Sequence, residues 1–328
     1  MARFFMLWVL GYSNTEKDSM SGLTKRFDAI YGRIAEAAAR SGRPADAVRL
    51  VAVSKQHAAE TVAELAVHWN ELNRLSWSAP EEGSVSVWRQ TRKASFCEDG
   101  LDSSVLPPEQ KRSLTKYHAK LRHYPVFGES YMQEAREKMP RVRELLAAKS
   151  GQTGTAADVP EWHFVGHVQS KKARDIVGRF SLIHSVDSLK LAQAFCKAWQ
   201  DRVAGAPLGL DEAAPGPQNI LVQVNVGREA QKSGVDPDAL EPLLQDIAAM
   251  PELRLQGLMC IPPLADIGED SRPYFVLLRE LRDKMESVCG LCLPELSMGM
   301  SDDFEAAIEE GTTLVRIGTD IFGSRGSL

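Results

Sequence analysis

The sequence predicts an α/β fold, a single (β/α)8 barrel of the TIM type. From Val48 onward, short β-rich runs alternate with amphipathic helical stretches, which is typical of βα units in a parallel sheet. A helical stretch at Leu23–Arg40 precedes the first run, and eight runs follow, the strand number of a closed barrel. An open doubly wound sheet is the alternative, but Ser54 and Lys55 replace the glycine-rich turn that usually follows its first strand.

The expected strands are short runs that end next to polar or glycine residues. They are Leu50–Ser54, Pro125–Gly128, Trp162–Gly166, Leu182–Val186, Ile220–Val226, Leu255–Cys260, Glu295–Met298 and Leu314–Ile317. Helical periodicity between them is clearest at Ser130–Lys149, Ser188–Asp201, Pro237–Met250 and Arg272–Val288. Because barrels of this fold carry their sites on the loops after the strands, the residues at those strand ends are the functional candidates.

Composition and charge exclude several classes of function. The chain has 328 residues, 44% of them hydrophobic and 25% charged, with a formal net charge of −5. This balance gives no basic footprint for nucleic acid or for an acidic membrane surface. The five cysteines are odd in number and suit a reducing, cytoplasmic compartment. Cys289 and Cys292 form the only close pair, and without further ligands nearby they predict no metal site.

The N-terminal residues 1–19 are expected to lie outside the barrel, which would occupy residues 20–328. The apolar run Phe4–Leu10 is too short to span a bilayer, and no small-residue cleavage site follows it. Since Met20 begins an ordinary helix lead-in, residues 1–19 are either a disordered extension or the product of a start codon assigned too far upstream.

The segment Leu296–Gly323 has the pattern of a phosphate site. One expected strand runs into Gly299 and Ser301, and the last strand ends at Gly318 and Thr319. Helix N-termini and small residues present backbone N–H groups to anions, and the loops after strands seven and eight are the recurring phosphate loops of this barrel. The alternative is an ordinary capped helix, because Asp302-x-x-Glu305 also reads as a capping box.

Lys55 is the candidate nucleophile. A lysine after an apolar strand is by default a solvated strand end. At the mouth of a barrel, however, lost hydration lowers the pKa of the amine from about 10.4, and the neutral amine can attack an aldehyde. A reactive lysine and a phosphate site together suit an aldehyde-bearing phosphate cofactor.

Seven motifs resemble one known family, in the order in which they occur along the chain. They are LVAVSK, FGESYMQEA, WHFVGHVQSKK, IHSVDS, VQVNVGREAQKSG, LQGLMCIPP and SMGMSDDFEAAIEEGTTLVRIGTDIFG, and they cover most of Leu23–Arg325. The chain resembles the pyridoxal phosphate homeostasis proteins, which are similar to the barrel domain of alanine racemase. The resemblance implies a fold-type III barrel that binds pyridoxal 5'-phosphate (PLP) but lacks the C-terminal β domain of the racemases.

The resemblance implies a role for particular residues. Lys55 would form the internal aldimine, and Arg316 would face the pyridine nitrogen. The phosphate would lie against Ser297, Gly299, Ser301, Gly318 and Thr319. His163, Asn225 and Met259 would line or support the ring, with packing of the barrel interior as the alternative. The chain departs from the family at Ser130 and Lys171, where asparagine is usual.

A large insertion also departs from the family. Lys55 and Phe127 are separated by many more residues than in the family, so the segment of about residues 69–123 is an insertion. Within it, a helix is expected at Pro108–Leu121. Because the insertion leaves the helix after strand one and returns to strand two, it belongs to the face opposite the site. We expect it to serve interaction or oligomerisation, or to be partly disordered, and not to take part in catalysis.

The resemblance implies a cytoplasmic PLP carrier that maintains vitamin B6 and amino-acid homeostasis without strong turnover of its own. The chain ends shortly after Gly318, so we expect no second domain to supply the other acid or base of a racemase. A PLP-dependent racemase or decarboxylase, with residual racemase activity at least, and a Schiff-base aldolase without PLP remain the alternatives. PLP-dependent apo-enzymes are the expected partners, and the protein is expected to be a monomer or a weak dimer.

Overall fold

The computed structural model describes residues 21–77, 125–153, 159–204, 216–263 and 271–323, and within them a closed barrel of eight parallel strands in chain order. Pairing of β1 with both β2 and β8 closes the barrel. The strands are β1 Arg49–Val53, β2 Val126–Glu129, β3 Glu161–Phe164, β4 Leu182–Val186, β5 Gln218–Gln223, β6 Leu253–Met259, β7 Glu295–Ser297 and β8 Leu314–Ile317. The predicted fold class is therefore confirmed.

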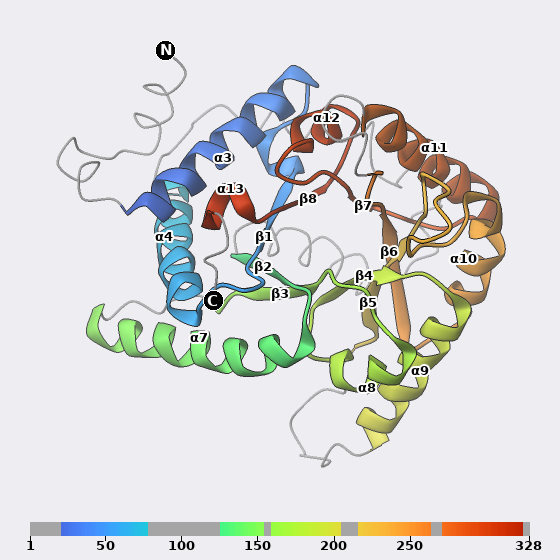
Figure 1. The fold of residues 1–328 in the computed structure, drawn as a ribbon, viewed down its shortest axis with the longest axis horizontal. Helices are drawn as coiled ribbons and strands as arrows, with labels where there is room; N and C mark the ends of the chain where they lie inside the picture. Colours follow the sequence, from blue (N-terminus) through green and yellow to red (C-terminus); the bar gives the residue numbers. More distant parts are fainter. Residues whose placement is uncertain (1–20, 78–124, 154–158, 205–215, 264–270, 324–328) are drawn as a thin grey trace, which may run out of the picture.

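Helices surround the barrel on the outside, as Figure 1 shows in a view close to the barrel axis. They are α3 Gly22–Arg40, α4 Ala59–Trp77, α7 Met132–Thr153, α8 Ala173–Ile176, α9 Leu189–Ala204, α10 Leu240–Ala248, α11 Arg272–Cys289, α12 Phe304–Glu309 and α13 Thr319–Phe322. Short 3-10 turns at Ala45–Ala47, Ser170–Lys172 and Pro237–Ala239 lead into β1, α8 and α10. No helix among these described ranges is long and apolar enough to cross a bilayer.

The predicted strands match the observed ones within three residues at each end, and β4 and β8 match fully. The predicted insertion from about residue 69 stays a prediction, and its first described residues continue helix α4, which runs through Trp77. Trp69 is 5% exposed and packs between Phe27 and Phe127, with ring centroids 4.9 and 6.2 Å apart. The predicted extension at residues 1–19, the rest of the insertion and its expected helix lie outside the described residues.

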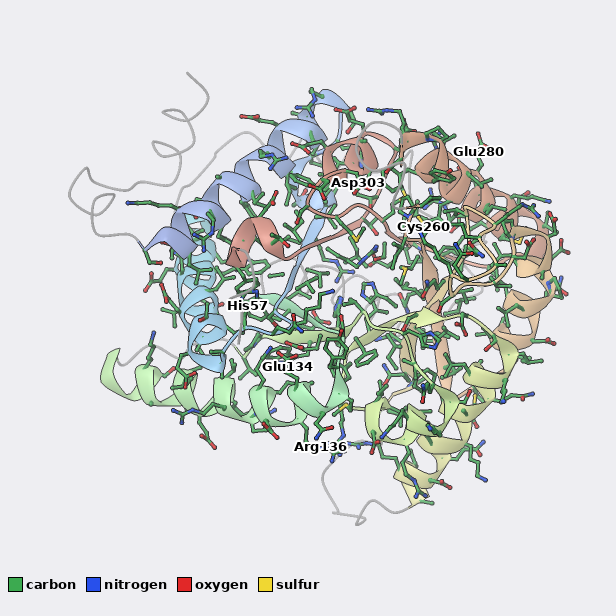
Figure 2. The ribbon with its side chains drawn as sticks, in the orientation of Figure 1. His57, Glu134, Arg136, Cys260, Glu280 and Asp303 are labelled. Carbon is green, nitrogen blue, oxygen red and sulfur yellow. The ribbon has the colours of Figure 1, made fainter. Side chains whose placement is uncertain are left out.

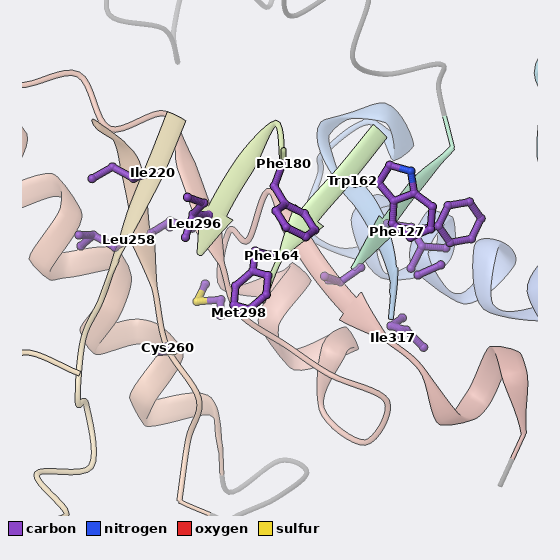
Figure 3. Packing of buried hydrophobic residues seen from close by; sticks show 14 of the residues in the cluster. Phe127, Trp162, Phe164, Phe180, Ile220, Leu258, Cys260, Leu296, Met298 and Ile317 are labelled. Atoms are coloured by element: carbon purple, nitrogen blue, oxygen red, sulfur yellow. The ribbon is translucent and has the colours of Figure 1, made fainter. Parts of the chain in front are cut away.

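The barrel is packed on both sides of its strands. Between strands and helices lies a continuous apolar core, part of which Figure 3 shows around Phe127, Trp162 and Phe164. Inside the barrel, one apolar layer consists of Val51, Val126, Leu182, Leu221, Met259 and Leu314. Burying a large apolar side chain stabilises the fold by about 1.5–3 kcal/mol, so these layers account for much of the barrel's rigidity.

The amino-terminal end of the barrel is closed by polar contacts. Arg49, at the start of β1, forms an ion pair of 2.5 Å with Glu295, at the start of β7. The second oxygen of Glu295 accepts a hydrogen bond of 2.6 Å from Thr313, which precedes β8. These contacts and the apolar layer fill the lower barrel, which leaves the carboxyl ends of the strands as the place for a site.

Candidate functional site

Lys55 lies in a tight turn directly after β1. The N–H of His57 donates to the carbonyl of Ser54 at 3.1 Å, which closes the turn around Lys55 and Gln56. Ser54 is fully buried, whereas Lys55 is half-buried at the mouth of the barrel. The ring of His57 stacks on Phe322 of α13 at 4.8 Å, so the turn is tied to the segment that follows β8. The sequence-predicted lysine therefore lies beside one of the two predicted phosphate loops.

Gly299 is a position that only glycine fits. Its φ of +91° lies in the left-handed region, and a Cβ there would lie 2.6 Å from the Cβ of Ala307 in α12. The N–H of Arg316 donates to the carbonyl of Gly299 at 3.0 Å, which holds the loop after β7 against β8. The backbone can therefore approach a ligand closely at this point of the mouth.

Gly318 forms the adjoining part of the same cradle. A Cβ on it would lie 3.1 Å from the carbonyl oxygen of Val53, so the end of β8 packs directly on the end of β1. Gly318 also caps α13, whose first residue is Thr319. Because the first N–H groups of a helix have no partner within it, Gly318 and Thr319 present donors at the mouth, as an anion requires.

The capping box predicted at Asp302-x-x-Glu305 is wrong. Helix α12 begins at Phe304, and Glu305 instead pairs with Arg33 of α3 at 2.8 Å. Asp303 accepts a hydrogen bond of 2.7 Å from the N–H of Met300, and burial raises the pKa of its carboxyl. The loop from Gly299 to Asp303 is thus shaped by its own contacts and not by a capping box.

Arg316 is buried in the barrel beneath this mouth, at 5% exposure. One guanidinium nitrogen donates to the hydroxyl of Ser297 at 2.6 Å, and the other donates to the carbonyl of Cys260 at 2.9 Å. Burial lowers the pKa of the Arg316 guanidinium, but arginine stays protonated in proteins. These two contacts fix the guanidinium as a donor at the centre of the barrel.

A chain of hydrogen bonds continues from Arg316 through two histidines. The Ser297 hydroxyl lies 2.8 Å from Nδ1 of His184, and Nε2 of His184 lies 3.0 Å from Nδ1 of His163. Nε2 of His163 faces a carboxylate oxygen of Glu161 at 3.6 Å. Arginine can only donate, so the Ser297 hydroxyl accepts from Arg316, whereas the roles in the two histidine contacts depend on the tautomer of each ring. The contacts link the buried cation to the neighbourhood of the Glu161 carboxylate through Ser297, His184 and His163.

The surroundings of this chain of residues shift the pKa of His184 and of Glu161. Burial, reinforced by His163 and Arg316, holds the pKa of His184 well below its usual value, so its imidazole is neutral. Burial raises the pKa of Glu161, but the combined effects of His163, Ser181 and Arg49 outweigh burial and lower it. The result is a neutral histidine between a fixed cation and a fixed anion.

The structure brings most of the predicted site residues together and separates a few. Lys55, Gly299, Ser301, Gly318 and Thr319 follow strand ends that adjoin one another, and Arg316 lies below them. The hydroxyl of Ser297 is instead engaged by Arg316 and His184. Asn225 uses both atoms of its amide on the backbone of Glu229, at 2.9 and 3.2 Å. His163 and Met259 are almost fully buried in the barrel, so their contact with a ring stays a prediction.

The two departures from the family lie close to the mouth. The backbone of Ser130 lies against Gly166, where a Cβ would be 2.3 Å from the Ser130 carbonyl oxygen. The backbone of Ser130 therefore belongs to the contact between the loops after β2 and β3. Lys171 is exposed in the 3-10 turn before α8.

Sequence reasoning missed two sets of residues. His184 lies in the IHSVDS motif and points inward, a position that strand alternation from Leu182 indicates. Glu134 and Lys138 are four residues apart on α7 and therefore share one helix face, but nothing in the sequence shows that this face reaches the Lys55 turn. No group of three or more potential metal ligands occurs among the described residues.

This arrangement defines a class of protein: a parallel barrel with a lysine and a glycine-lined anion cradle at its carboxyl-terminal mouth. The family model "Alanine racemase, N-terminal domain" matches residues 113–326. The structure is similar to that of PipY from Synechococcus elongatus with PLP bound, at 26% identity and a TM-score of 0.55, over 88% of this chain and all of that one.

Sequence similarity to curated proteins shows to which family within this class the chain belongs. The pyridoxal phosphate homeostasis protein of Aquifex aeolicus is 40% identical over 224 residues, which cover 68% of this chain and 85% of that protein. The protein of the same name from Escherichia coli is 39% identical over 252 residues, covering 75% and 88%. The chain therefore belongs to the pyridoxal phosphate homeostasis proteins, as the motifs predicted.

Proposed function

We propose that this chain binds PLP at the barrel mouth and holds it in covalent linkage with Lys55. One observation carries the proposal: a lysine turn, a glycine cradle and a buried arginine meet at the ends of β1, β7 and β8. The cradle fits a phosphate group, because Gly299 and Gly318 occupy places where a side chain would collide with neighbouring atoms. The names of the relatives and the PLP-bound neighbour support the same ligand.

The chemistry of the linkage needs little from the protein. When bound, the cofactor would supply an aldehyde, and Lys55 would hold it by condensation of its amine with that aldehyde and loss of one water. Lys55 has to be neutral at that moment. We assign Gly299, Ser301, Gly318 and Thr319 to the phosphate, and the depth of Arg316 below the cradle matches a role at the ring nitrogen.

The arginine favours holding the cofactor over turning substrates over. A guanidinium can donate to the pyridine nitrogen but cannot accept a hydrogen bond from a protonated one. The ring nitrogen then stays unprotonated, and the ring withdraws electrons weakly. We therefore assign the protein a non-catalytic role, with Ser297 as the acceptor that orients Arg316.

The wider role we propose is maintenance of the PLP pool in the cytoplasm. No disulfide joins the described cysteines Cys196, Cys260, Cys289 and Cys292, which suits a reducing compartment. The open mouth at Lys55 suits release to PLP-dependent apo-enzymes, and we expect a monomer or a weak dimer.

Absorption spectra test the proposal. Purified protein is mixed with PLP and scanned before and after borohydride, for wild type, Lys55→Ala and Lys190→Ala, the last an exposed lysine of α9 as the control. We expect a visible band that borohydride fixes to the chain in wild type and in the control, and no fixed cofactor in Lys55→Ala. Absence of a fixed adduct in wild type refutes the proposal.

The same samples test the absence of strong turnover. Solvent deuterium exchange at the α-carbon of L-alanine, followed by NMR, reports on proton abstraction by the loaded protein. We expect exchange no faster than with free PLP. Exchange at rates of about 1 per second or more, typical of enzymes, would place the chain among the racemase-like enzymes instead.

A further inference from the structure

Buried charges lie directly beneath the Lys55 turn. Lys138 of α7 is 6% exposed, and its amine donates to the carbonyl of Ser54 at 2.6 Å and to Glu129 at 2.8 Å. It also donates to Glu134, one helical turn earlier. A buried lysine is normally avoided unless its charge is compensated, and here every contact lies next to the turn.

The other side of the turn is held by Glu134. Gln56 has a φ of +64°, a left-handed conformation that residues with a Cβ rarely adopt. Its N–H donates to the carboxylate of Glu134 at 2.6 Å. A charged acceptor makes this a strong hydrogen bond, which offsets the unfavourable backbone conformation.

The two contacts hold the peptide groups on both sides of one residue. Ser54 is held through its carbonyl by Lys138 and through its hydroxyl by Glu129, at 2.6 Å. Gln56 is held through its N–H by Glu134. Lys55 lies between these two peptide groups. Two side chains of α7, Lys138 and Glu134, therefore set the direction in which the Cα–Cβ bond of Lys55 points. Burial raises the pKa of Glu129, an effect that Lys138 opposes.

We propose that Glu134 and Lys138 are positioning residues that clamp the Ser54–Gln56 turn and thereby set the rate at which Lys55 links to its cofactor. The inference rests on the proposed function. It adds that α7, a helix outside the barrel, controls the reactivity of the lysine in the turn after β1. Figure 2 shows Glu134 on the side of α7 that faces the barrel and Arg136 on the outer side.

The clamp predicts a separation between binding and linkage. The residues that we assign to the phosphate and to the ring nitrogen belong to β7, β8 and the loops after them, and none of them lies on α7. Loss of the clamp should therefore leave the amount of bound cofactor nearly unchanged and slow the covalent step. Misplacement of a reacting group by about 1 Å can cost about 100-fold in rate, so a loss of about tenfold or more is expected.

The test measures two quantities on each variant after addition of PLP: total bound cofactor by equilibrium dialysis, and the rate of the covalent linkage by rapid-quench borohydride trapping. The variants are Glu134→Ala, Glu134→Gln and Lys138→Met. Glu134→Gln keeps an oxygen acceptor for the Gln56 N–H and should retain most of the rate. Arg136→Ala, on the outer face of α7, is the matched control.

The outcomes decide between positioning and simple structural support. Slower linkage with unchanged total binding in Glu134→Ala and Lys138→Met, and recovery in Glu134→Gln, supports the clamp. Wild-type linkage rates in Glu134→Ala, or a parallel loss of binding and linkage, overturns it. Failure of both variants to fold, measured by thermal melting without cofactor, also overturns it in favour of a structural role. If wild type itself forms no linkage, the proposed function fails and not the clamp alone.

Discussion

The neutral, buried His184 makes the stability of the fold depend on pH in a way that one substitution should remove. We compare wild type with His184→Gln, which keeps a hydrogen-bonding side chain but cannot titrate. His184 is fully buried between Ser297 and His163, and its pKa lies well below 6.5 in the folded chain. The unfolded chain exposes this imidazole to water, where it titrates near 6.5.

The sign and size follow from proton linkage. Since the unfolded state binds the extra proton, the free energy of unfolding falls as the pH drops below the unfolded pKa. For a group that stays neutral when folded, the loss is about 1.4 kcal/mol at about pH 5.5 and less than about 0.1 kcal/mol at about pH 7.5. His184 alone should therefore destabilise wild type by about 1.3 kcal/mol between these two values of pH.

Urea unfolding at both values of pH measures this difference. The loss of unfolding free energy on acidification should be smaller by about 1.3 kcal/mol in His184→Gln than in wild type. His167→Gln is the matched control, because its side chain is 55% exposed and lies at the surface. Equal pH dependence in wild type and His184→Gln would refute the argument that His184 is held neutral by its surroundings.

Three further outcomes are expected. Gly299→Ala should lower the unfolding free energy by about 1–2 kcal/mol or more from the left-handed φ alone, and should weaken PLP binding measured by dialysis. Ser297→Ala should destabilise the cofactor-free protein by about 1–3 kcal/mol in urea unfolding, because it leaves the buried Arg316 donor unpaired. Iodoacetamide at about pH 8 should label the exposed Cys292 in the folded protein, whereas burial, which raises the pKa of Cys260 to about 12, should protect that thiol until unfolding, as peptide mass mapping would show.

The fold was predictable because its pattern is local. Each strand is a short apolar run with a polar or glycine end, and the helices between them show clear periodicity. The packing of particular side chains was not predictable in the same way. The ring of Trp69 in α4 packs between Phe27 and Phe127, which are distant from it in sequence. Tertiary contacts of this kind leave no trace in a local pattern.

The site was predictable only where the backbone defines it. The strand-end lysine and the glycines of the cradle follow from barrel geometry, because positions after strands meet at one mouth. The side-chain network does not follow from it. The hydroxyl of Ser297 accepts from Arg316, and the amide of Asn225 donates to the carbonyl of Glu229 in its own loop, contacts that no local pattern indicates.

The contacts at the amino-terminal end of the barrel restrict how the proposed PLP carrier could work. Among the described residues, Arg49, Glu295 and the apolar layer occupy the amino-terminal part of the interior, so a cofactor held at Lys55 would enter and leave at the carboxyl-terminal mouth. Under the proposed function, a PLP molecule has to leave through the mouth by which it entered before another PLP molecule can bind. Release and rebinding of PLP then cannot occur at the same time. A protein that received PLP directly would have to approach the carboxyl-terminal face of the barrel, the same face that free PLP approaches.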